Sequence, residues 1–177
     1  MRPGVARLDV DLPIRLGDAV RVNNRSPVEA FAGIANKLAY DRLEMQRFIT
    51  RHQLTRVRMN PFFPVNTLKI MRMAVAAEEL GCAPEYIDAV FSAMWEQARN
   101  MDDADEIAAA LRGAGLDAAA LWAKAQEPEV KARLAAHTQS AFDRGAFGSP
   151  TFFVGDDMFF GKDRLREFEE AIVNSSQ

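Results

Sequence analysis

Residues 145–165, Gly-Ala-Phe-Gly-Ser-Pro-Thr-Phe-Phe-Val-Gly-Asp-Asp-Met-Phe-Phe-Gly-Lys-Asp-Arg-Leu, decide the fold of this chain. Two short apolar runs, Thr151–Val154 and Met158–Phe160, flank the turn-forming cluster Gly155–Asp157. Runs rich in β-branched and aromatic residues around a Gly/Asp cluster are typical of a β-hairpin. The stretch therefore predicts two antiparallel strands joined by a tight turn.

The residues on either side of this hairpin predict how it is connected. Gly145 should end a preceding helix, and Ser149-Pro150 then leads into the first strand. Proline fits the first residue of a strand, and only an X-Pro bond is commonly cis, so we expect a bend that exposes the backbone of Ser149. Asp163 stands where an N-cap belongs, before apolar residues at helical spacing. These residues are Leu165, Phe168 and Ile172.

Composition limits the classes of protein to which the chain can belong. With 177 residues, 49% of them hydrophobic, it predicts one globular domain or one domain with an insertion. The net charge of −3 implies no general attraction to nucleic acid. Cys82 is the single cysteine, so an intrachain disulfide is excluded. Cys82, His52 and His137 lie far apart in sequence and make a poor set of metal ligands, so no metal site is expected. No apolar run is long enough for a membrane, and no signal peptide is evident, so we expect a cytoplasmic protein.

The N-terminal third predicts a strand, a loop, a helix and a second loop. Leu8–Leu16 alternates apolar and polar residues, as in a strand. Asn24 lies in the loop that follows, and its simplest interpretation is an ordinary turn residue. Ala35–His52 has the apolar spacing of a helix. In the loop that follows, two prolines bracket Phe62 and Phe63. The two rings either fill space in the core (the core-plug interpretation), which composition favours, or form the wall of a pocket.

The middle of the chain predicts a block of helices. Capping residues, prolines at first turns and terminal glycines divide residues 67–145 into successive helices, and the helix that contains Trp95 should end at Asn100. The element order is a strand, a helical block, a β-hairpin and a last helix, which indicates one α/β sheet with a helical insertion. The expected fold is thioredoxin-like with a large all-α insertion. Residues 1–34 and 127–177 would form the thioredoxin-like domain, and residues 35–126 the helical insertion domain.

Several motifs resemble those of 2-hydroxychromene-2-carboxylate isomerases, which are relatives of kappa-class glutathione transferases and of thioredoxin-fold disulfide oxidoreductases. The likeness rests on Phe147–Leu165, on the loop Asn60–Leu68 (Asn-Pro-Phe-Phe-Pro-Val-Asn-Thr-Leu), on Asn24–Pro27 and on Lys37–Tyr40. The Ser-Pro-Thr-Phe piece alone is common among thioredoxin-fold proteins, whereas its continuation and the middle loop are specific. The resemblance extends from about Leu8 to Ile172.

One part of the family pattern is not found. Members of the family open with a strand and a helix that carry a Ser-Pro stretch, whose serine activates glutathione. Here only Met1–Arg7 precede the segment that resembles the second strand, and no serine comes before Ser26. We therefore expect an N-terminally truncated fold, explained by a mis-assigned start or by an inactive homologue, and the catalytic residue stays unknown. If Met1 is the true start, we expect poor glutathione binding and no turnover.

The resemblance implies a cofactor, a substrate and their binding residues. Glutathione would be held by Asn24, by the backbone at Ser149 beside Pro150, and by Lys162 and Asp163. The substrate would be a small aromatic carboxylate, a 2-hydroxychromene-2-carboxylate that interconverts with its open-chain form through transient thiol addition in aromatic-compound degradation. Its contacts would be Lys37, with Arg21 as a less certain match, and the rings of Phe62 and Phe63. A homodimer is also implied.

Other interpretations stay open from the residues alone. The same motifs fit a kappa-like glutathione transferase, a disulfide oxidoreductase or an inactive remnant. Asp163 is explained by capping alone, Pro150 is structural in thioredoxin-like folds, and Lys162 fits a solvated position. Cys82 is expected to be a small structural residue, and His137 a half-exposed structural histidine.

Overall fold

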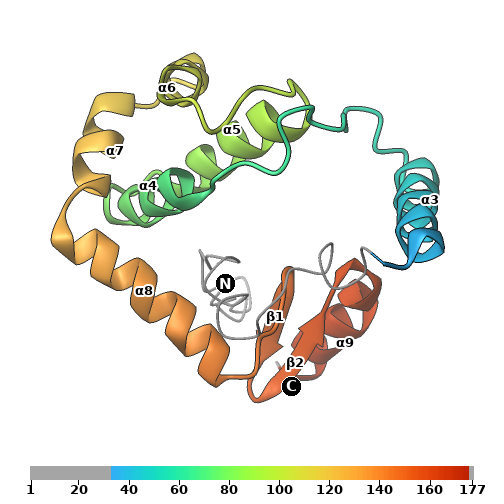
Figure 1. The fold of residues 1–177 in the computed structure, drawn as a ribbon. Helices are drawn as coiled ribbons and strands as arrows, with labels where there is room; N and C mark the ends of the chain where they lie inside the picture. Colours follow the sequence, from blue (N-terminus) through green and yellow to red (C-terminus); the bar gives the residue numbers. More distant parts are fainter. Residues whose placement is uncertain (1–32, 176–177) are drawn as a thin grey trace, which may run out of the picture.

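The computed structural model of the chain describes residues 33–175. The strand expected at Leu8–Leu16, Arg21 and the candidate ligand Asn24 lie outside the described residues. The elements in chain order are α3 (Ala35–Arg51), α4 (Leu68–Glu79), α5 (Ala83–Trp95), α6 (Ala104–Gly113), α7 (Ala118–Ala125), α8 (Pro128–Asp143), β1 (Thr151–Val154), β2 (Asp157–Phe160), the 3-10 turn η1 (Lys162–Arg164) and α9 (Leu165–Ser175), as Figure 1 shows.

The helix boundaries follow the predicted caps. The carboxylate of Asp103 accepts hydrogen bonds from two N–H groups of the first turn of α6, and that of Asp117 does the same for α7. Gly81 and Gly145 adopt positive φ angles of 71° and 95° just beyond α4 and α8, a conformation that glycine reaches at little cost. The prediction that the helix containing Trp95 extends to Asn100 was wrong. That helix ends at Trp95, because the next residues turn back and their N–H groups bond to carbonyls of its last turn.

Helices α4 to α8 enclose the hydrophobic core. Helix α4 contacts α5, α7 and α8, and its residues 73–77 are buried. The Tyr86 hydroxyl donates a 2.7 Å hydrogen bond to the Ile70 carbonyl oxygen, so that this buried polar group is satisfied. The largest fully buried side chains lie in this region; they are Tyr86, Met73, Met101, Ile107, Leu111, Leu121, Val75 and Val130.

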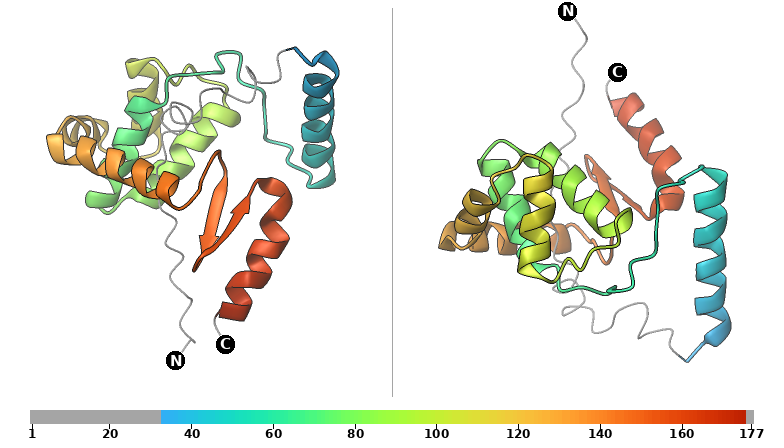
Figure 2. Two further views of the ribbon diagram at one scale, coloured as in Figure 1. Left: turned by 60° about the horizontal axis from the view of Figure 1, so that its bottom comes forward. Right: turned by 90° about the horizontal axis from the view of Figure 1, so that it is seen from above.

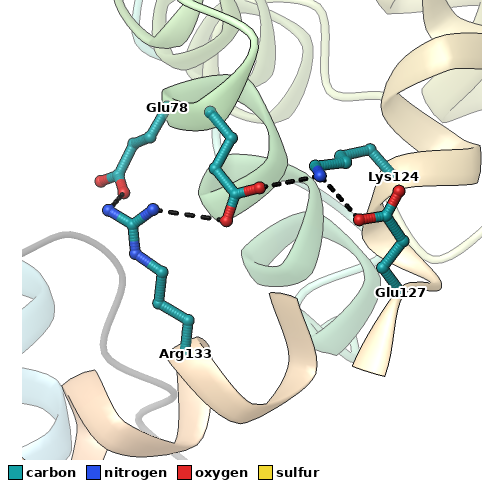
Figure 3. A network of polar contacts seen from close by, with 5 residues as sticks. Glu78, Lys124, Glu127 and Arg133 are labelled. Carbon is teal, nitrogen blue, oxygen red and sulfur yellow. Dashed lines mark hydrogen bonds and ion pairs between the residues drawn. The ribbon is translucent and has the colours of Figure 1, made fainter. Parts of the chain in front are cut away.

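A network of ion pairs joins the last turns of α4 and α7 to the first half of α8 (Figure 3). The Lys124 ammonium of α7 lies 3.0 Å from Glu79 of α4 and 2.6 Å from Glu127, the residue before α8. The Arg133 guanidinium of α8 lies 3.0 Å from Glu78 and 3.4 Å from Glu79. Glu79 therefore shares its two oxygens between two helices, and Lys124 in particular holds the pKa of Glu79 below its usual value.

The predicted hairpin and last helix are confirmed. Strands β1 and β2 pair antiparallel, with Thr151 opposite Phe160 and Val154 opposite Asp157. Helix α9 packs against the hairpin (Figure 2), where the Phe168 ring lies 4.7 Å from Phe152 and 5.9 Å from Phe159 between centroids. Among residues 33–175 the sheet has these two strands only.

Helix α3 stands apart from the helical core and lies on the side of α9 (Figures 1 and 2). None of its side chains is fully buried, and Leu43 and Met45 of the predicted apolar face are nearly half exposed. Within the described part of the molecule, this apolar face is therefore not covered by the helical core. The Phe48 ring instead faces the Lys162 ammonium, which lies 4.7 Å from the ring centroid. The predicted division into a thioredoxin-like domain (residues 1–34 and 127–177) and a helical insertion domain (residues 35–126) stays a prediction.

Within residues 33–175, no helix has the length and apolar character needed to cross a membrane.

Candidate functional site

The loop between α8 and β1 presents main-chain atoms at the surface. The Ser149–Pro150 peptide bond is cis, and both residues are exposed, in agreement with the bend expected from the sequence. The Pro150 carbonyl oxygen accepts a 2.9 Å hydrogen bond from the Gly161 N–H, which places this loop beside the segment after β2. In the described part of the chain, no hydrogen bond uses the N–H or carbonyl of Ser149. Exposed main-chain groups without a partner in the described structure are suited to pairing with an extended peptide.

Two features hold this loop, and the sequence did not reveal them. The Arg144 guanidinium, at the end of α8, donates a 3.1 Å hydrogen bond to the Gly155 carbonyl and lies 3.8 Å from the centroid of the Phe153 ring. At Gly148, a Cβ atom would lie 2.8 Å from the edge of the Phe160 ring. The hairpin turn is thus tied to α8, and the loop approaches β2 so closely that a Cβ at Gly148 would require the Phe160 ring to move.

Lys162 and Asp163 lie in η1, directly after Gly161. The prediction that Asp163 is an N-cap was wrong, since α9 begins at Leu165 and no described hydrogen bond joins the Asp163 carboxylate to a helix N–H. The carboxylate accepts a 2.5 Å hydrogen bond from the Lys162 ammonium, and its side chain is 75% exposed. Asp163 is therefore accessible to a cationic group of a ligand, while Lys162 is placed between Asp163 and the Phe48 ring.

Phe62 and Phe63 project from the loop between α3 and α4. Their residues are 51% and 54% exposed, so the core-plug interpretation favoured by composition was wrong. The Phe63 ring lies 5.7 Å from the Trp95 ring of α5. The buried Asn60 side chain anchors the loop, because its amide donates to the carbonyls of Met94 (2.9 Å) and Arg99 (2.8 Å) and its oxygen accepts from the Phe62 N–H (2.8 Å).

Lys37 belongs to the first turn of α3 and is partly exposed. Its ammonium donates to Asp41 one turn later in the same helix. The structure brings Ser149 and Pro150 together with Lys162 and Asp163 through the Pro150–Gly161 hydrogen bond. It shows no described contact from this group to Lys37, Phe62 or Phe63.

Cys82 and His137 lie where the sequence placed them. Cys82 is partly buried and unbonded, directly before α5. His137 is half-buried in α8, as expected, and its Nδ1 is buried without a described hydrogen-bond partner. Neither residue has a described contact with the cis-proline loop.

Comparison with known proteins identifies the family. The family model described as the DSBA-like thioredoxin domain matches residues 10–173, nearly the whole chain. The chain belongs to this family. The predicted thioredoxin-like fold is confirmed by that match and by two solved structures.

The solved structures are a 2-hydroxychromene-2-carboxylate isomerase and the oxidoreductase DsbA. The isomerase is 26% identical, with a TM-score of 0.71 over 91% of this chain and 77% of that one. The oxidoreductase DsbA from Xylella fastidiosa is 27% identical, with a TM-score of 0.51 over 64% of each chain.

Curated relatives confirm the resemblance found in the sequence. A protein of Pseudomonas putida named 2-hydroxychromene-2-carboxylate isomerase is 30% identical over 139 residues, which cover 77% of this chain and 66% of the relative. The protein of that name from Pseudomonas sp. (strain C18) is 29% identical over 139 residues, 77% of this chain and 63% of the relative. The chain thus spans slightly less than two thirds of the length of these relatives.

Proposed function

We propose that this protein is a glutathione-dependent isomerase of the 2-hydroxychromene-2-carboxylate type that acts on a small aromatic carboxylate. The observation that carries the proposal is the Ser149 backbone beside cis-Pro150, which has no described hydrogen-bond partner. The Pro150–Gly161 hydrogen bond places it near the segment that carries the exposed Asp163 carboxylate. The names of the relatives support the reaction type. The proposal includes a homodimer and a role in aromatic-compound degradation in the cytoplasm.

The described residues fit one part of glutathione binding. The Ser149 N–H and carbonyl would pair with the cysteinyl residue of the tripeptide as an added strand does. The Asp163 carboxylate would accept hydrogen bonds from the γ-glutamyl ammonium, because it is exposed and held in place by Lys162. Asn24, outside the described residues, completes the proposed set.

Bound glutathione would supply a thiol that adds transiently to the conjugated system of the substrate and leaves after the bond has rotated. The protein must therefore orient the substrate and exclude competing reactions. Phe62 and Phe63 would contact the aromatic ring, and Lys37 would approach the carboxylate. None of these described residues is assigned to activation of the thiol.

The proposal is tested by calorimetric titration of glutathione into the purified chain, together with an absorbance assay of chromene isomerisation with and without glutathione. We expect saturable binding, which would contradict the poor binding expected if Met1 is the true start. Asp163→Asn should weaken this binding about tenfold, because a charge-assisted hydrogen bond is lost. Asp156→Asn, which removes an exposed carboxylate from the hairpin turn, is the matched control and should leave binding unchanged.

Isomerisation that does not depend on glutathione would contradict the proposal, as would the absence of both binding and turnover. Conjugation of an electrophilic halonitroaromatic without chromene turnover would indicate a transferase of the kappa type instead. Sedimentation of the chain as a monomer would remove the dimer from the proposal.

A further inference from the structure

The Lys162 ammonium joins helix α3 to the candidate glutathione site. It lies over the Phe48 ring of α3, 4.7 Å from the ring centroid, and donates a hydrogen bond to the Asp163 carboxylate. The side chain of Lys162 is 29% exposed and that of Asp163 is 75% exposed, so the ammonium is the more enclosed member of this ion pair. A ring, an ammonium and a carboxylate thus adjoin, although α3 and η1 are far apart in sequence.

The Phe48 ring offers the ammonium a supported face. Phe48 is half-buried, and the ring of His52, one helical turn later, lies 4.3 Å from the Phe48 ring between centroids. The face of an aromatic ring attracts a cation, and this attraction restricts a lysine side chain that otherwise samples many rotamers. The contact with Phe48 therefore limits where the Lys162 ammonium can lie.

The adjacent charges of Lys162 and Asp163 match a zwitterionic ligand group. A lysine ammonium has three N–H donors, and Asp163 accepts one of them, so donors remain for a ligand. The γ-glutamyl end of glutathione carries an ammonium and a carboxylate on the same carbon atom. If its ammonium pairs with Asp163, its carboxylate comes within reach of the neighbouring Lys162 ammonium.

We propose that Phe48 is a positioning residue of the glutathione site. Its ring holds the Lys162 ammonium where this group pairs with the α-carboxylate of the γ-glutamyl end, while Asp163 pairs with the α-ammonium. The inference rests on the proposed function for the identity of the ligand. It deepens that function by assigning one ligand group to Lys162 and by including a residue of α3 that does not itself contact glutathione.

The test is calorimetric titration of three peptides into the unchanged chain and its variants. Glutathione is compared with 4-aminobutanoyl-Cys-Gly, which lacks the α-carboxylate, and with glutaryl-Cys-Gly, which lacks the α-ammonium. Phe48→Leu should raise the Kd of glutathione about threefold, the size expected for one partly exposed cation–π contact. The increase should be similar for glutaryl-Cys-Gly. It should be smaller for 4-aminobutanoyl-Cys-Gly, because that peptide has no carboxylate for Lys162 to bind.

Two further variants separate positioning from general packing. Phe48→Tyr keeps an aromatic face for the ammonium and should bind glutathione as tightly as the unchanged chain does. Tyr40→Leu is the matched control, because it also replaces an aromatic residue of α3 with leucine. Tyr40 is 54% exposed and has no ring contact in the described structure, so this change should leave the Kd of glutathione unaltered.

A double-mutant cycle shows whether Phe48 acts through Lys162. Lys162→Met removes the ammonium and should raise the Kd of glutathione more than Phe48→Leu does. In the Lys162→Met background, Phe48→Leu should have no further effect, because the contact that it removes is already absent. An equal effect of Phe48→Leu in both backgrounds, equal increases in Kd for all three peptides, or as large a loss in Phe48→Tyr would overturn the inference. The failure of the unchanged chain to bind any of the peptides would also overturn it.

The outcome is separate from that of the proposed function. Glutathione binding that depends on Phe48 through Lys162, without chromene turnover, would support the positioning role and contradict the isomerase. Glutathione-dependent turnover together with an unchanged Kd of glutathione in Phe48→Leu would support the isomerase and contradict the positioning role.

Discussion

The helical core and the hairpin unit (β1, β2 and α9) differ in how they are stabilised. Helices α4 to α8 fully bury large side chains, whereas no side chain of the hairpin or α9 is fully buried within the described structure. A two-stranded hairpin is marginally stable by itself. The candidate glutathione site is carried by this less covered unit, which depends on contacts such as Phe168 with Phe152 and Arg144 with Phe153. Local opening should therefore begin there.

The largest effect that separates the two regions is expected from truncation of a buried leucine. Leu111→Ala should lower the free energy of unfolding by about 2–5 kcal/mol, because Leu111 is fully buried and its removal leaves a cavity. Leu165→Ala in α9 makes the same chemical change at a residue that is 44% exposed, and should cost about 1 kcal/mol or less. Denaturant unfolding followed by tryptophan emission measures both. Equal losses would show that the hairpin unit is as well packed as the core.

The sequence predicted the elements of both regions but not their unequal burial. Caps such as Asp103 and Asp117 act within a few residues, so the starts of α6 and α7 could be read directly. Whether an apolar face is covered depends on segments distant in sequence. The apolar spacing in α3 therefore predicted the helix correctly but could not show that none of its side chains is fully buried.

The second effect concerns the close approach of Gly148 to β2. Gly148→Ala would place a Cβ 2.8 Å from the Phe160 ring, so the ring must move and its contact with Phe147 is disturbed. We expect a loss of about 1 kcal/mol or slightly more and weaker glutathione binding at the adjacent Ser149. The measurements are thermal unfolding and calorimetric titration.

A matched glycine in the helical core sharpens this result. Gly113, the last residue of α6, has no atom within 4 Å of an added Cβ, so Gly113→Ala should be neutral or stabilise by about 0.5 kcal/mol. Replacing Phe160 with leucine should recover part of the loss caused by Gly148→Ala. A Gly148→Ala protein as stable as the unchanged chain would show that the loop yields freely.

The third effect tests a buried polar group of the core. Tyr86→Phe removes the hydrogen bond to the Ile70 carbonyl and should cost about 1 kcal/mol near neutral pH. Burial raises the pKa of Tyr86 above its ordinary value, so the unfolded chain loses this proton first as pH rises. Its contribution is complete below about pH 10 and decreases at higher pH. The decline in stability between about pH 9 and 11 should be smaller in Tyr86→Phe than in the unchanged chain. Identical alkaline profiles would contradict this assignment, and Tyr40→Phe, at an exposed site, is the control.

The sequence predicted those parts of the candidate site whose residues are close together along the chain, and missed those that depend on distant elements. Local patterns identified Ser149, Pro150 and the segment with Lys162 and Asp163, which are close in sequence and lie together in space. Asn60 and Arg144 were missed, because their partners lie on other elements and neither residue type indicates an anchor by itself. The exposure of Phe62 and Phe63 follows from the Asn60 hydrogen bonds and could not be read from the two prolines.

The smallest effect is expected in the ion-pair network that joins α8 to α4. Glu79 has a lowered pKa in the folded chain, chiefly through Lys124 and to a lesser extent through Arg133. A lowered pKa stabilises the fold above the ordinary pKa of 4.5, and this contribution is lost as pH decreases through the folded value. Arg133→Gln should therefore reduce the loss of stability between about pH 7 and about pH 3. The effect should be small and weakened by salt, because these side chains are partly exposed.

Arg166→Gln is the control for this network in the hairpin unit. Arg166 pairs with Glu170 at 2.9 Å within α9, and its side chain is 86% exposed, so the pair joins no second element. Denaturant unfolding at the two pH values, with and without added salt, should show a pH-dependent change for Arg133→Gln that exceeds that for Arg166→Gln. The reverse order would mean that the network does not stabilise the attachment of α8 to the core. The difference between the two regions would then rest on apolar burial alone.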